Sequence, residues 1–429
     1  MRDVVKGRVL VPGDDGFDEA ARPWAVGVRQ QVAAVVEAED ADDVAAVVRY
    51  ARDNGLTVTA QPSGHGAPGD LDGTVLLRTA RLDHVAVDPG ERVARVGAGV
   101  RWGRVLAEAG RHRLAAPAGS SAAVTVTGFV AGGGISWFGR AHGWAADSVR
   151  AFEVVDADGE RVRVTAESDA ELFWALRGGG GDYAIITSVD LDLFEAPSVY
   201  GGRITWPAAR TGEVFEAFRS LTAAAPPELS LWVNRMAAPP PAPPVVTLDV
   251  TFLGEAADAK ALLAPLEDVG GSLSDSRGPV DVADLGTIAA EPVDPSPVLA
   301  RVELLTELPT GALVDAELAP LLNLQVRHLG GALAQARPGG GAGGALTEPY
   351  LLYLLGLRLP HTAEATRERQ AALVAELGEV ISGRKPYTFL APGESASQAF
   401  DDATLARLRR VKRDRDPRRV FRANFPVSE

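Results

Sequence analysis

The chain has 429 residues, of which 46% are hydrophobic and 23% charged, and its formal net charge is −14. This length predicts two domains or one elaborated domain, and an acidic chain without a basic stripe argues against nucleic acid and anionic membranes as partners. The absence of cysteine excludes disulfides and thiol catalysis, and six widely spaced histidines predict no zinc or other metal site. No apolar run suits a transmembrane helix or a signal peptide, so we expect a cytoplasmic protein.

The first half of the chain predicts an α/β arrangement of short strands. A strand at 32–36 precedes a helix that begins in the acidic segment 39–43 and ends at Asn54-Gly55. Further strands are expected at 56–60, 74–78, 85–88 and 92–97, and a helix at 101–112. The turn Asp156-Ala157-Asp158-Gly159 predicts a hairpin that joins 151–155 to 161–165.

After Pro197 the pattern changes to longer strands separated by helices. We expect strands at 200–206, 230–236, 245–253, 323–328 and 350–358, and helices near 210–223, 256–267, 361–382 and 402–413. The proline-rich segment 239–244 predicts a loop, and the glycine-rich segment 338–344 predicts a flexible loop or lid. Arginines at 407–419 are interleaved with acids, which indicates a solvated helix face. Residues 198–384 therefore favour an antiparallel sheet covered by helices.

Four glycine-rich turns lie in the first 200 residues, at 61–69, 97–103, 119–134 and 178–183. Glycines let the backbone approach a ligand closely, and successive N–H groups can bind an anion. The segment 97–103 has the spacing G-x-G-x-x-x-G with no acidic residue about 20 positions on, which argues against a nicotinamide dinucleotide site. No cluster continues as a P-loop. A long phosphate-bearing cofactor with a flat ring system would fit, although the turn at His65 taken alone could be an ordinary surface turn.

The ordered motifs resemble a known family. The segments 62–67, 96–103, 128–134, 158–159, 172–183 and 408–424 are similar to motifs of the vanillyl-alcohol oxidase and p-cresol methylhydroxylase (PCMH) superfamily. Over nearly its full length the chain resembles the berberine-bridge-enzyme-like oxidoreductases. The resemblance implies an α+β fold: a two-part PCMH-type FAD-binding domain, residues 1–197 and 385–429, and a substrate-binding domain, residues 198–384, with an antiparallel sheet covered by helices.

The resemblance also implies FAD as the cofactor. In this family the histidine of the Gly-His-Gly turn is often bonded to the 8α carbon of the flavin, a role that carries onto His65. Because the chain has no cysteine, a second covalent link is impossible, which is similar to the singly linked 6-hydroxy-D-nicotine oxidase type. The residues expected to contact FAD are His65, Ser63, Gly64, Gly66, Ala67, Gly119, Ser120, Ser121, Gly128, Gly132, Gly133, Ile185 and Asn424.

The implied activity is that of an FAD-dependent oxidase that removes two electrons from a small organic substrate, in secondary metabolism, with O2 reoxidising the flavin to give H2O2. A flavoprotein with a non-redox role, binding or cyclisation in the same pocket, is the alternative. It stays open because relatives often carry Asn-Phe-Gly where this chain has Asp182-Tyr183-Ala184, and Asn where it has Thr388. We expect a small-molecule substrate and molecular oxygen as partners, and a monomer or homodimer.

Tyr387 is the preferred acid/base candidate, because it lies where the terminal segment re-enters the cofactor domain. Tyr350, Tyr353 and Glu348 are the other candidates. A phenol needs a cationic or hydrogen-bonding neighbour to act as a base at neutral pH, and each tyrosine could instead be packed in the core. His142 is expected to be structural, whereas His328 could face the substrate pocket.

Overall fold

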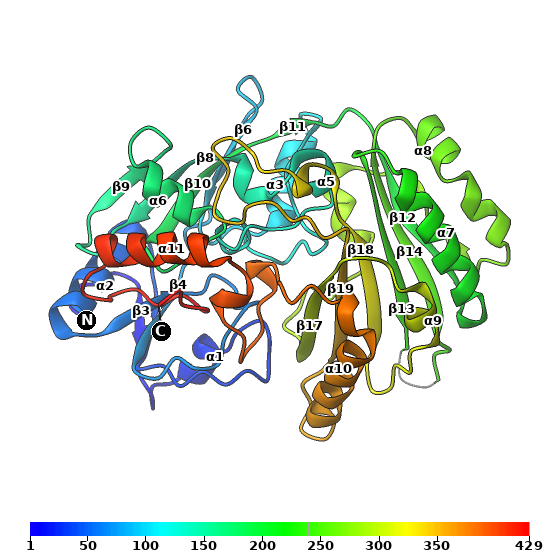
Figure 1. Ribbon diagram of the computed structural model, residues 1–429. Helices are drawn as coiled ribbons and strands as arrows, with labels where there is room; N and C mark the ends of the chain where they lie inside the picture. The colour runs from blue at the N-terminus through cyan, green and yellow to red at the C-terminus, as the bar shows by residue number, and fades with distance from the viewer. Residues whose placement is uncertain (238–240, 429) are drawn as a thin grey trace.

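The computed structural model describes residues 1–237 and 241–428, and two sheets organise its first half (Figure 1). In the four-stranded sheet β2, β3 and β4 run parallel and β1 is antiparallel. Helix α2 (Ala41–Asn54) begins at Asp40, whose carboxylate accepts the N–H groups of Asp42 and Asp43, and ends at Gly55 with a left-handed φ of 67°. The sheet order is β1 (Arg8–Leu10), β2 (Ala34–Glu37), β4 (Thr74–Arg78), β3 (Thr57–Ala60).

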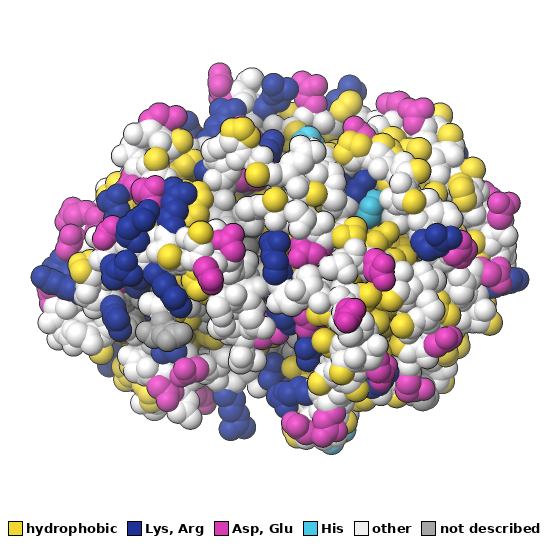
Figure 2. Space-filling model, in the orientation of Figure 1, with side chains coloured by type: hydrophobic (Ala, Val, Ile, Leu, Met, Phe, Trp, Pro, Cys, Tyr) yellow, Lys and Arg dark blue, Asp and Glu magenta, His cyan; other side chains and the backbone are white. Residues whose placement is uncertain are grey.

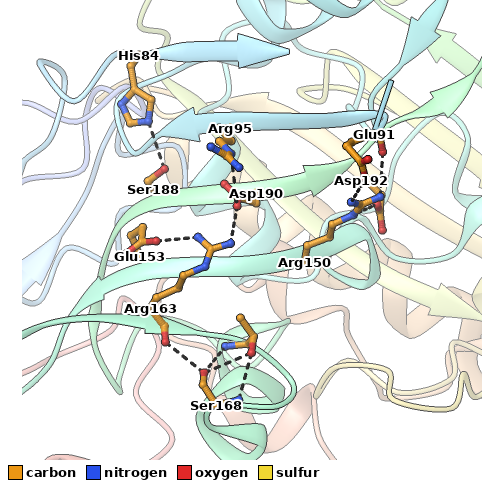
Figure 3. A network of polar contacts seen from close by, with 11 residues as sticks. His84, Glu91, Arg95, Arg150, Glu153, Arg163, Ser168, Ser188, Asp190 and Asp192 are labelled. Carbon is orange, nitrogen blue, oxygen red and sulfur yellow. Dashed lines mark hydrogen bonds and ion pairs between the residues drawn. The ribbon is translucent and has the colours of Figure 1, made fainter. Parts of the chain in front are cut away.

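The second sheet is five-stranded and antiparallel, in the order β5 (Val85–Asp88), β6 (Val93–Gly97), β10 (Ile185–Asp192), β8 (Val149–Val155), β9 (Arg161–Val164). One face carries exposed ion pairs, in which Arg163 joins Glu153 and Asp190 (Figure 3). The other face contributes to a core with helices that include α3 (Trp102–Gly110), α4 (Val126–Ala131) and α6 (Ala170–Leu176).

An eight-stranded antiparallel sheet forms the second half, and its two faces differ. One face packs its alternate apolar residues, among them Leu231 and Val233, against α7 (Thr211–Ala224), α9 (Thr310–Asp315) and α10 (Ala363–Leu377). On the other face Trp232 stacks on Trp137 of the first half, with ring centroids 3.7 Å apart. Strand order is β15 (Ser274–Asp275), β12 (Val199–Pro207), β14 (Val245–Leu253), β13 (Leu229–Met236), β18 (Asn323–His328), β19 (Tyr350–Leu357), β17 (Val298–Leu305), with β16 (Gly278–Pro279) also on β12.

The C-terminal segment returns to the first half. Helix α11 (Asp402–Arg415) packs near α6, and Phe421 bridges to Val58 of β3 (Figure 1). Basic side chains gather over α11 on the surface shown in Figure 2, and Arg413 and Arg418 are exposed, which confirms the solvated helix face. The remaining short elements are α1 (Phe17–Ala21), α5 (Gly139–His142), α8 (Ala256–Leu262), β7 (Leu114–Ala115) and β11 (Phe194–Glu195).

Most of the expected elements are confirmed, but one expected helix is divided and two long strands were not expected. The helix expected at 256–267 splits into α8 and a 3₁₀ helix, Ala264–Val269, where Pro265 lacks the N–H that an α-helix needs. Strands β10 and β17 were not expected. The segment 338–344 is a loop, as expected, and it contacts the first half: Ala342 donates to Arg177 O (2.8 Å) and Gly341 to Asp147 Oδ1 (3.1 Å). That it moves as a lid stays a prediction.

Two further expectations are not settled. The loop expected at 239–244 falls partly outside the described residues, and its described part, 241–244, contains no helix or strand. The division at 197 and 385 stays a prediction. Among the described residues, no helix combines the length and apolarity that crossing a bilayer requires.

Candidate active site

His65 lies in a turn between β3 and β4, under the side chain of Trp24. The two rings stack with centroids 4.0 Å apart. Nδ1 lies 2.7 Å from the Ser63 hydroxyl, whereas Nε2 is buried and has no hydrogen-bond partner among the described residues. Burial, helped by the charge of Arg101, lowers the pKa of His65 to about 4. The imidazole is therefore neutral at neutral pH and keeps a lone pair available for a bond or a ligand.

Two other segments of the chain hold the turn in place. Asn424 from the C-terminal segment donates to Gly66 O (2.8 Å) and accepts from Gln61 Nε2 (3.1 Å). Gly64 has a φ of 79°, and a Cβ there would lie 2.7 Å from Pro23, so this position requires glycine. The structure thus brings Ser63, Gly64, His65 and Gly66 together with Asn424, which is more than 350 residues away in sequence.

An open cleft of about 500 Å³ adjoins this turn and is lined by Pro62, Ser63 and Trp24. Its cationic side chains are those of Arg8, Arg22, Arg78, Arg81 and Arg101. Arg78 is saturated by backbone carbonyls, including Gln61 O at 2.9 Å. Glu37 and Glu19 also line the cleft and pair with Arg8 (2.9 Å) and Arg22 (2.7 Å). The lining side chains still carry more positive than negative charge, in a chain that is acidic as a whole.

The second group of expected cofactor residues faces the eight-stranded sheet. Ser120 donates to Glu291 Oε1 (2.6 Å), which lies between β16 and β17. Gly119 approaches the ring of Phe129, and Ser121 Oγ accepts from Ala123 N at 3.3 Å. The turn 119–121 is thus in contact with the residues that border the sheet face.

The third group surrounds the glycines of 128–134. A Cβ on Gly132 would lie 3.2 Å from Thr388 Cα, and Gly133, with a φ of 99°, lies against Trp144. Gly180 N donates to Ala131 O at 2.9 Å, which joins the third and fourth glycine clusters. Ile185 is buried in β10 and belongs to a different core, which it shares with Val58 and Leu77 of the four-stranded sheet.

The glycines of 97–103 have a different explanation from the other clusters. A Cβ on Gly97 would lie 2.2 Å from Leu82 O, and one on Gly99 would lie 2.3 Å from Thr79 O. These glycines permit two backbone segments to pack closely. This contact agrees with the conclusion that the segment is not a nicotinamide fingerprint.

The surroundings of Tyr387 favour packing over catalysis. Its hydroxyl donates to Phe425 O (2.7 Å), and its ring stacks on Phe400. Burial, with the nearby Asp182 charge, raises its pKa well above the ordinary value. No cationic side chain that could activate the phenol contacts it among the described residues. Because Phe425 O accepts the hydroxyl, Tyr387 fits the alternative reading, in which the tyrosine is packed in the core.

Asp182, where relatives often carry Asn, organises the C-terminal segment. Its carboxylate accepts the N–H groups of Ala423 and Val427, both at 2.7 Å. The ammonium of Lys412 donates to Asp182 O, Phe421 O and the Asp416 carboxylate at 2.7–2.8 Å. The aspartate that replaces asparagine at position 182 therefore has a structural role in this chain.

The face of the eight-stranded sheet opposite the helices carries a buried polar network that the sequence reasoning missed. Asn234 on β13 donates to Asp249 on β14 (3.1 Å) and accepts from Gln325 on β18 (2.7 Å). Arg327 donates to Gln325 Oε1 (2.6 Å), and its guanidinium carbon lies 3.9 Å from the ring centroid of Trp232. The alternation of Asn323, Gln325 and Arg327 was the available signal, since a period of two places them on one face.

The two other tyrosine candidates for an acid/base role lie on opposite faces of the eight-stranded sheet. Tyr353 lies on the polar face, with Arg327 over its ring at 5.4 Å. Tyr350 and His328 point to the helix-covered side, where the Tyr350 hydroxyl lies 2.8 Å from Thr222 Oγ1 and His328 Nε2 lies 3.0 Å from Arg140 Nη1. His328 therefore lies on the face opposite the polar network, because adjacent strand residues point to opposite faces.

Two further candidates are placed by their contacts. His142 stacks on Phe194, with ring centroids 3.9 Å apart, as expected for a structural histidine. Glu348 is buried, its Oε2 has no hydrogen-bond partner among the described residues, and Arg384 lies 3.6 Å away. The described residues contain no group of three or more side chains suited to hold a metal ion.

Comparisons with known proteins agree with this geometry. Residues 32–165 match the family model for an FAD binding domain. The chain is 28% identical to (R)-6-hydroxynicotine oxidase of Paenarthrobacter nicotinovorans over 466 aligned positions, which cover 99% of this chain and 97% of that protein. The crystal structure of 6-hydroxy-D-nicotine oxidase from Arthrobacter nicotinovorans has a TM-score of 0.84 at 26% identity and covers 99% of this chain and 98% of its own.

Two more solved structures share the fold. A berberine-bridge-enzyme-like protein of Physcomitrella patens has a TM-score of 0.86 at 19% identity, with 99% of this chain and 98% of its own covered. Glucooligosaccharide oxidase from Acremonium strictum, which has a 6-S-cysteinyl, 8α-N1-histidyl FAD, has a TM-score of 0.84 at 23% identity, with 98% and 97% covered. Residues 32–165 therefore form an FAD-binding domain, and over nearly its full length the chain is homologous to 6-hydroxynicotine oxidase and shares the fold of the berberine-bridge-enzyme-like protein.

Proposed function

We propose that the chain is an oxidase that removes two electrons from a small organic substrate, with FAD bonded covalently to His65 and O2 as the final electron acceptor, giving H2O2. FAD supplies the hydride acceptor. The observation that carries the proposal is the buried, unpartnered Nε2 of a neutral imidazole in the glycine-rich turn. This nitrogen fits a group that forms a bond to it, because a buried polar atom without a partner is unfavourable.

The rest of the site supports a phosphate-bearing cofactor. The cleft beside Ser63 supplies cationic side chains, of which Arg101 is exposed beside the turn. At Ser120–Ser121 and Gly128–Gly133 a cofactor could approach the backbone closely, on the side of the first half that faces the polar face of the eight-stranded sheet. We propose that this sheet face holds the substrate and excludes water from it, with Trp137 and Trp232 at its floor.

Tyr353 replaces Tyr387 as our proposed acid/base residue. It lies on the substrate-facing side of β19 beside Arg327, and its hydroxyl has no hydrogen-bond partner among the described residues. Burial raises its pKa to about 12, so in the free site the phenol holds its proton. Its role is to accept a hydrogen bond from a substrate O–H or N–H, or to donate one to it, beside the guanidinium of Arg327.

The first experiment tests the linkage. Acid-precipitated protein should stay yellow, and mass spectrometry of the peptide that contains His65 should show the added mass of FAD. His65→Ala should release its flavin on precipitation, whereas His84→Ala, which alters a histidine on the five-stranded sheet, should keep it. Covalent flavin in His65→Ala protein would exclude the assignment.

The second experiment tests the chemistry. Phenolic, amine and polyketide-like compounds are screened anaerobically for bleaching of the flavin, and O2 consumption and H2O2 are then measured with the best one. Tyr353→Phe should slow flavin reduction by roughly 10²-fold, a common scale for a proton-transfer residue, and Tyr387→Phe should change it only a few-fold. A pocket that converts a compound without ever bleaching the flavin would favour the non-redox role. The cytoplasmic location and the monomeric or homodimeric state stay predictions.

A further inference from the structure

Arg327 is a buried cation whose terminal nitrogens have no hydrogen-bond partner among residues 1–237 and 241–428. Its side chain is only 5% exposed. Nε donates to Gln325 Oε1, but among the described residues neither Nη atom makes a hydrogen bond and no carboxylate lies within 4.0 Å of the guanidinium. Burial lowers the pKa of Arg327, although the charge of Glu291 opposes this. Since a guanidinium remains charged even so, the charge has to be balanced in another way.

Other buried arginines of this chain show what a structural arginine looks like. Arg140 donates to the carbonyls of Leu229, Leu329, Ala225 and Pro226. Arg203 pairs with the buried carboxylate of Asp249 and also donates to Ala289 O at 3.1 Å. A buried charge left without such partners is destabilising, and protein interiors rarely retain one. Arg327 differs from these arginines, and its free donors indicate a ligand that binds there.

The groups around Arg327 define the shape of that ligand. The guanidinium lies over the ring of Trp232, and Tyr353 and Phe389 stand at 5.4 and 5.5 Å from its carbon. Trp232 is itself fixed by Trp137. Trp137 covers one face of Trp232 and the guanidinium covers the other, so the rings that a ligand on Arg327 can contact are those of Tyr353 and Phe389. Flat aromatic rings favour a flat ligand. The Tyr353 hydroxyl adds a hydrogen-bonding group that is also without a protein partner among the described residues.

The position of Arg327 connects it to the expected flavin contacts on two sides. Phe389 follows Thr388, which lies against Gly132. Glu291, whose charge acts on both Arg327 and Tyr353, accepts the hydroxyl of Ser120. Because Glu291 is held by Ser120 and lies beyond ion-pair distance, it does not occupy the terminal nitrogens of Arg327.

We propose that Arg327 binds the carboxylate of a planar aromatic or conjugated substrate, through both Nη atoms, with the ring of that substrate in contact with the rings of Tyr353 and Phe389. The guanidinium fork matches a carboxylate in two parallel hydrogen bonds, which a neutral group cannot provide. This inference rests on the proposed function, because it assigns the substrate class of the same site. It involves no redox step of its own.

The test is equilibrium binding to the oxidised holoenzyme, followed by calorimetry and by tryptophan fluorescence. The probes are benzoate and 2-naphthoate, with benzamide and 2-naphthamide as neutral partners of the same shape. Each carboxylate should bind at least tenfold more tightly than its amide, the scale of a charge-assisted hydrogen bond. Arg327→Gln should remove this preference and Arg327→Lys should retain part of it. Arg150→Gln, on the exposed face of the five-stranded sheet, should leave it unchanged.

Equal affinities of the wild-type enzyme for benzoate and benzamide would overturn the inference, and this comparison needs no variant to fold. A preference that survives in Arg327→Gln would also overturn the inference, since another cation would then be responsible. The state of the flavin is measured separately by acid precipitation and anaerobic bleaching. If the carboxylate preference depends on Arg327 but the flavin is never reduced, the oxidase proposal is contradicted and the assignment of Arg327 still holds.

Discussion

The buried charges at the C-terminal junction and those on the sheet face differ in one respect, which is how many of their hydrogen bonds the protein itself satisfies. Lys412 has three acceptors at 2.7–2.8 Å, and Asp182 accepts two backbone N–H groups at 2.7 Å. Arg327 is equally buried and makes a single hydrogen bond among the described residues. A charge that the fold satisfies fastens segments together, whereas a charge that the fold leaves unsatisfied indicates where a ligand belongs.

The strongest way to break the satisfied cluster is to remove its cation. Lys412→Met leaves the Asp416 carboxylate and two carbonyls without their partner, and we expect a loss of about 3–5 kcal/mol in the free energy of unfolding. Urea denaturation followed by circular dichroism measures this loss. The control is the neighbouring Arg413→Met, whose side chain is exposed and whose effect should stay within about 0.5 kcal/mol. Similar losses in both variants would show that the cluster is not what fastens the tail.

A second change tests the packing of the same junction without altering a charge. Gly180 has a φ of 88°, and a Cβ there would lie 2.3 Å from the Tyr387 hydroxyl, which is held by Phe425 O. Gly180→Ala should destabilise the protein by about 2–4 kcal/mol, from backbone strain together with overpacking. Gly181→Ala is the matched control, because nothing lies within 4 Å of its Cβ. Thermal denaturation of the two variants should separate them clearly, and equal midpoints would contradict the tight contact at Tyr387.

A third prediction concerns His328, which neighbours Arg327 on β18 but points to the opposite face of the sheet. Burial, and then the charge of Arg140, lower the pKa of His328 to about 3. The unfolded chain binds a proton at this histidine below about pH 6.5 and the folded chain does not, so stability falls as the pH falls. Between neutral pH and about pH 5 this one group should remove about 2 kcal/mol.

The measurement is the urea midpoint at several pH values. His328→Asn should show a shallower decline than the wild type, whereas His361→Asn, at an exposed position before α10, should follow the wild-type curve. Parallel curves for the wild type and His328→Asn would mean that His328 is protonated in the folded protein.

The smallest expected effect concerns charges that are satisfied but exposed. Arg163 pairs with Glu153 at 2.7 Å and with Asp190 at 2.8 Å on the outer face of the five-stranded sheet (Figure 3), and its side chain is 49% exposed. Water and salt screen such pairs, so Arg163→Ala should remove about 1 kcal/mol or less. Denaturation at low and high salt should show this small loss shrinking further as salt increases. If Arg163→Ala lost as much free energy of unfolding as Lys412→Met, burial would not explain the difference between the two cations.

Local signals in the sequence determined much of the fold. The start of α2 in the acidic segment 39–43, its end at Asn54-Gly55 and the Asp156–Gly159 hairpin follow from interactions within a few residues, and the structure has each where it was predicted. The motif at His65 indicated a cofactor turn for the same reason, since glycines and a histidine carry their chemistry locally. The family resemblance then supplied FAD and the overall α+β class, which the comparisons show.

Long-range contacts decided the rest. Tyr387, Tyr353 and Tyr350 are indistinguishable as phenols in the sequence, and only the packing of β19 and of the C-terminal segment sets one beside Arg327 and buries another against Phe425. Arg327 itself drew no notice, because a lone arginine in a strand is ordinary until its neighbours are known. Whether a charge has partners depends on residues such as Trp232 and Glu291, which lie far away in sequence, and only the folded chain determines their distance from it.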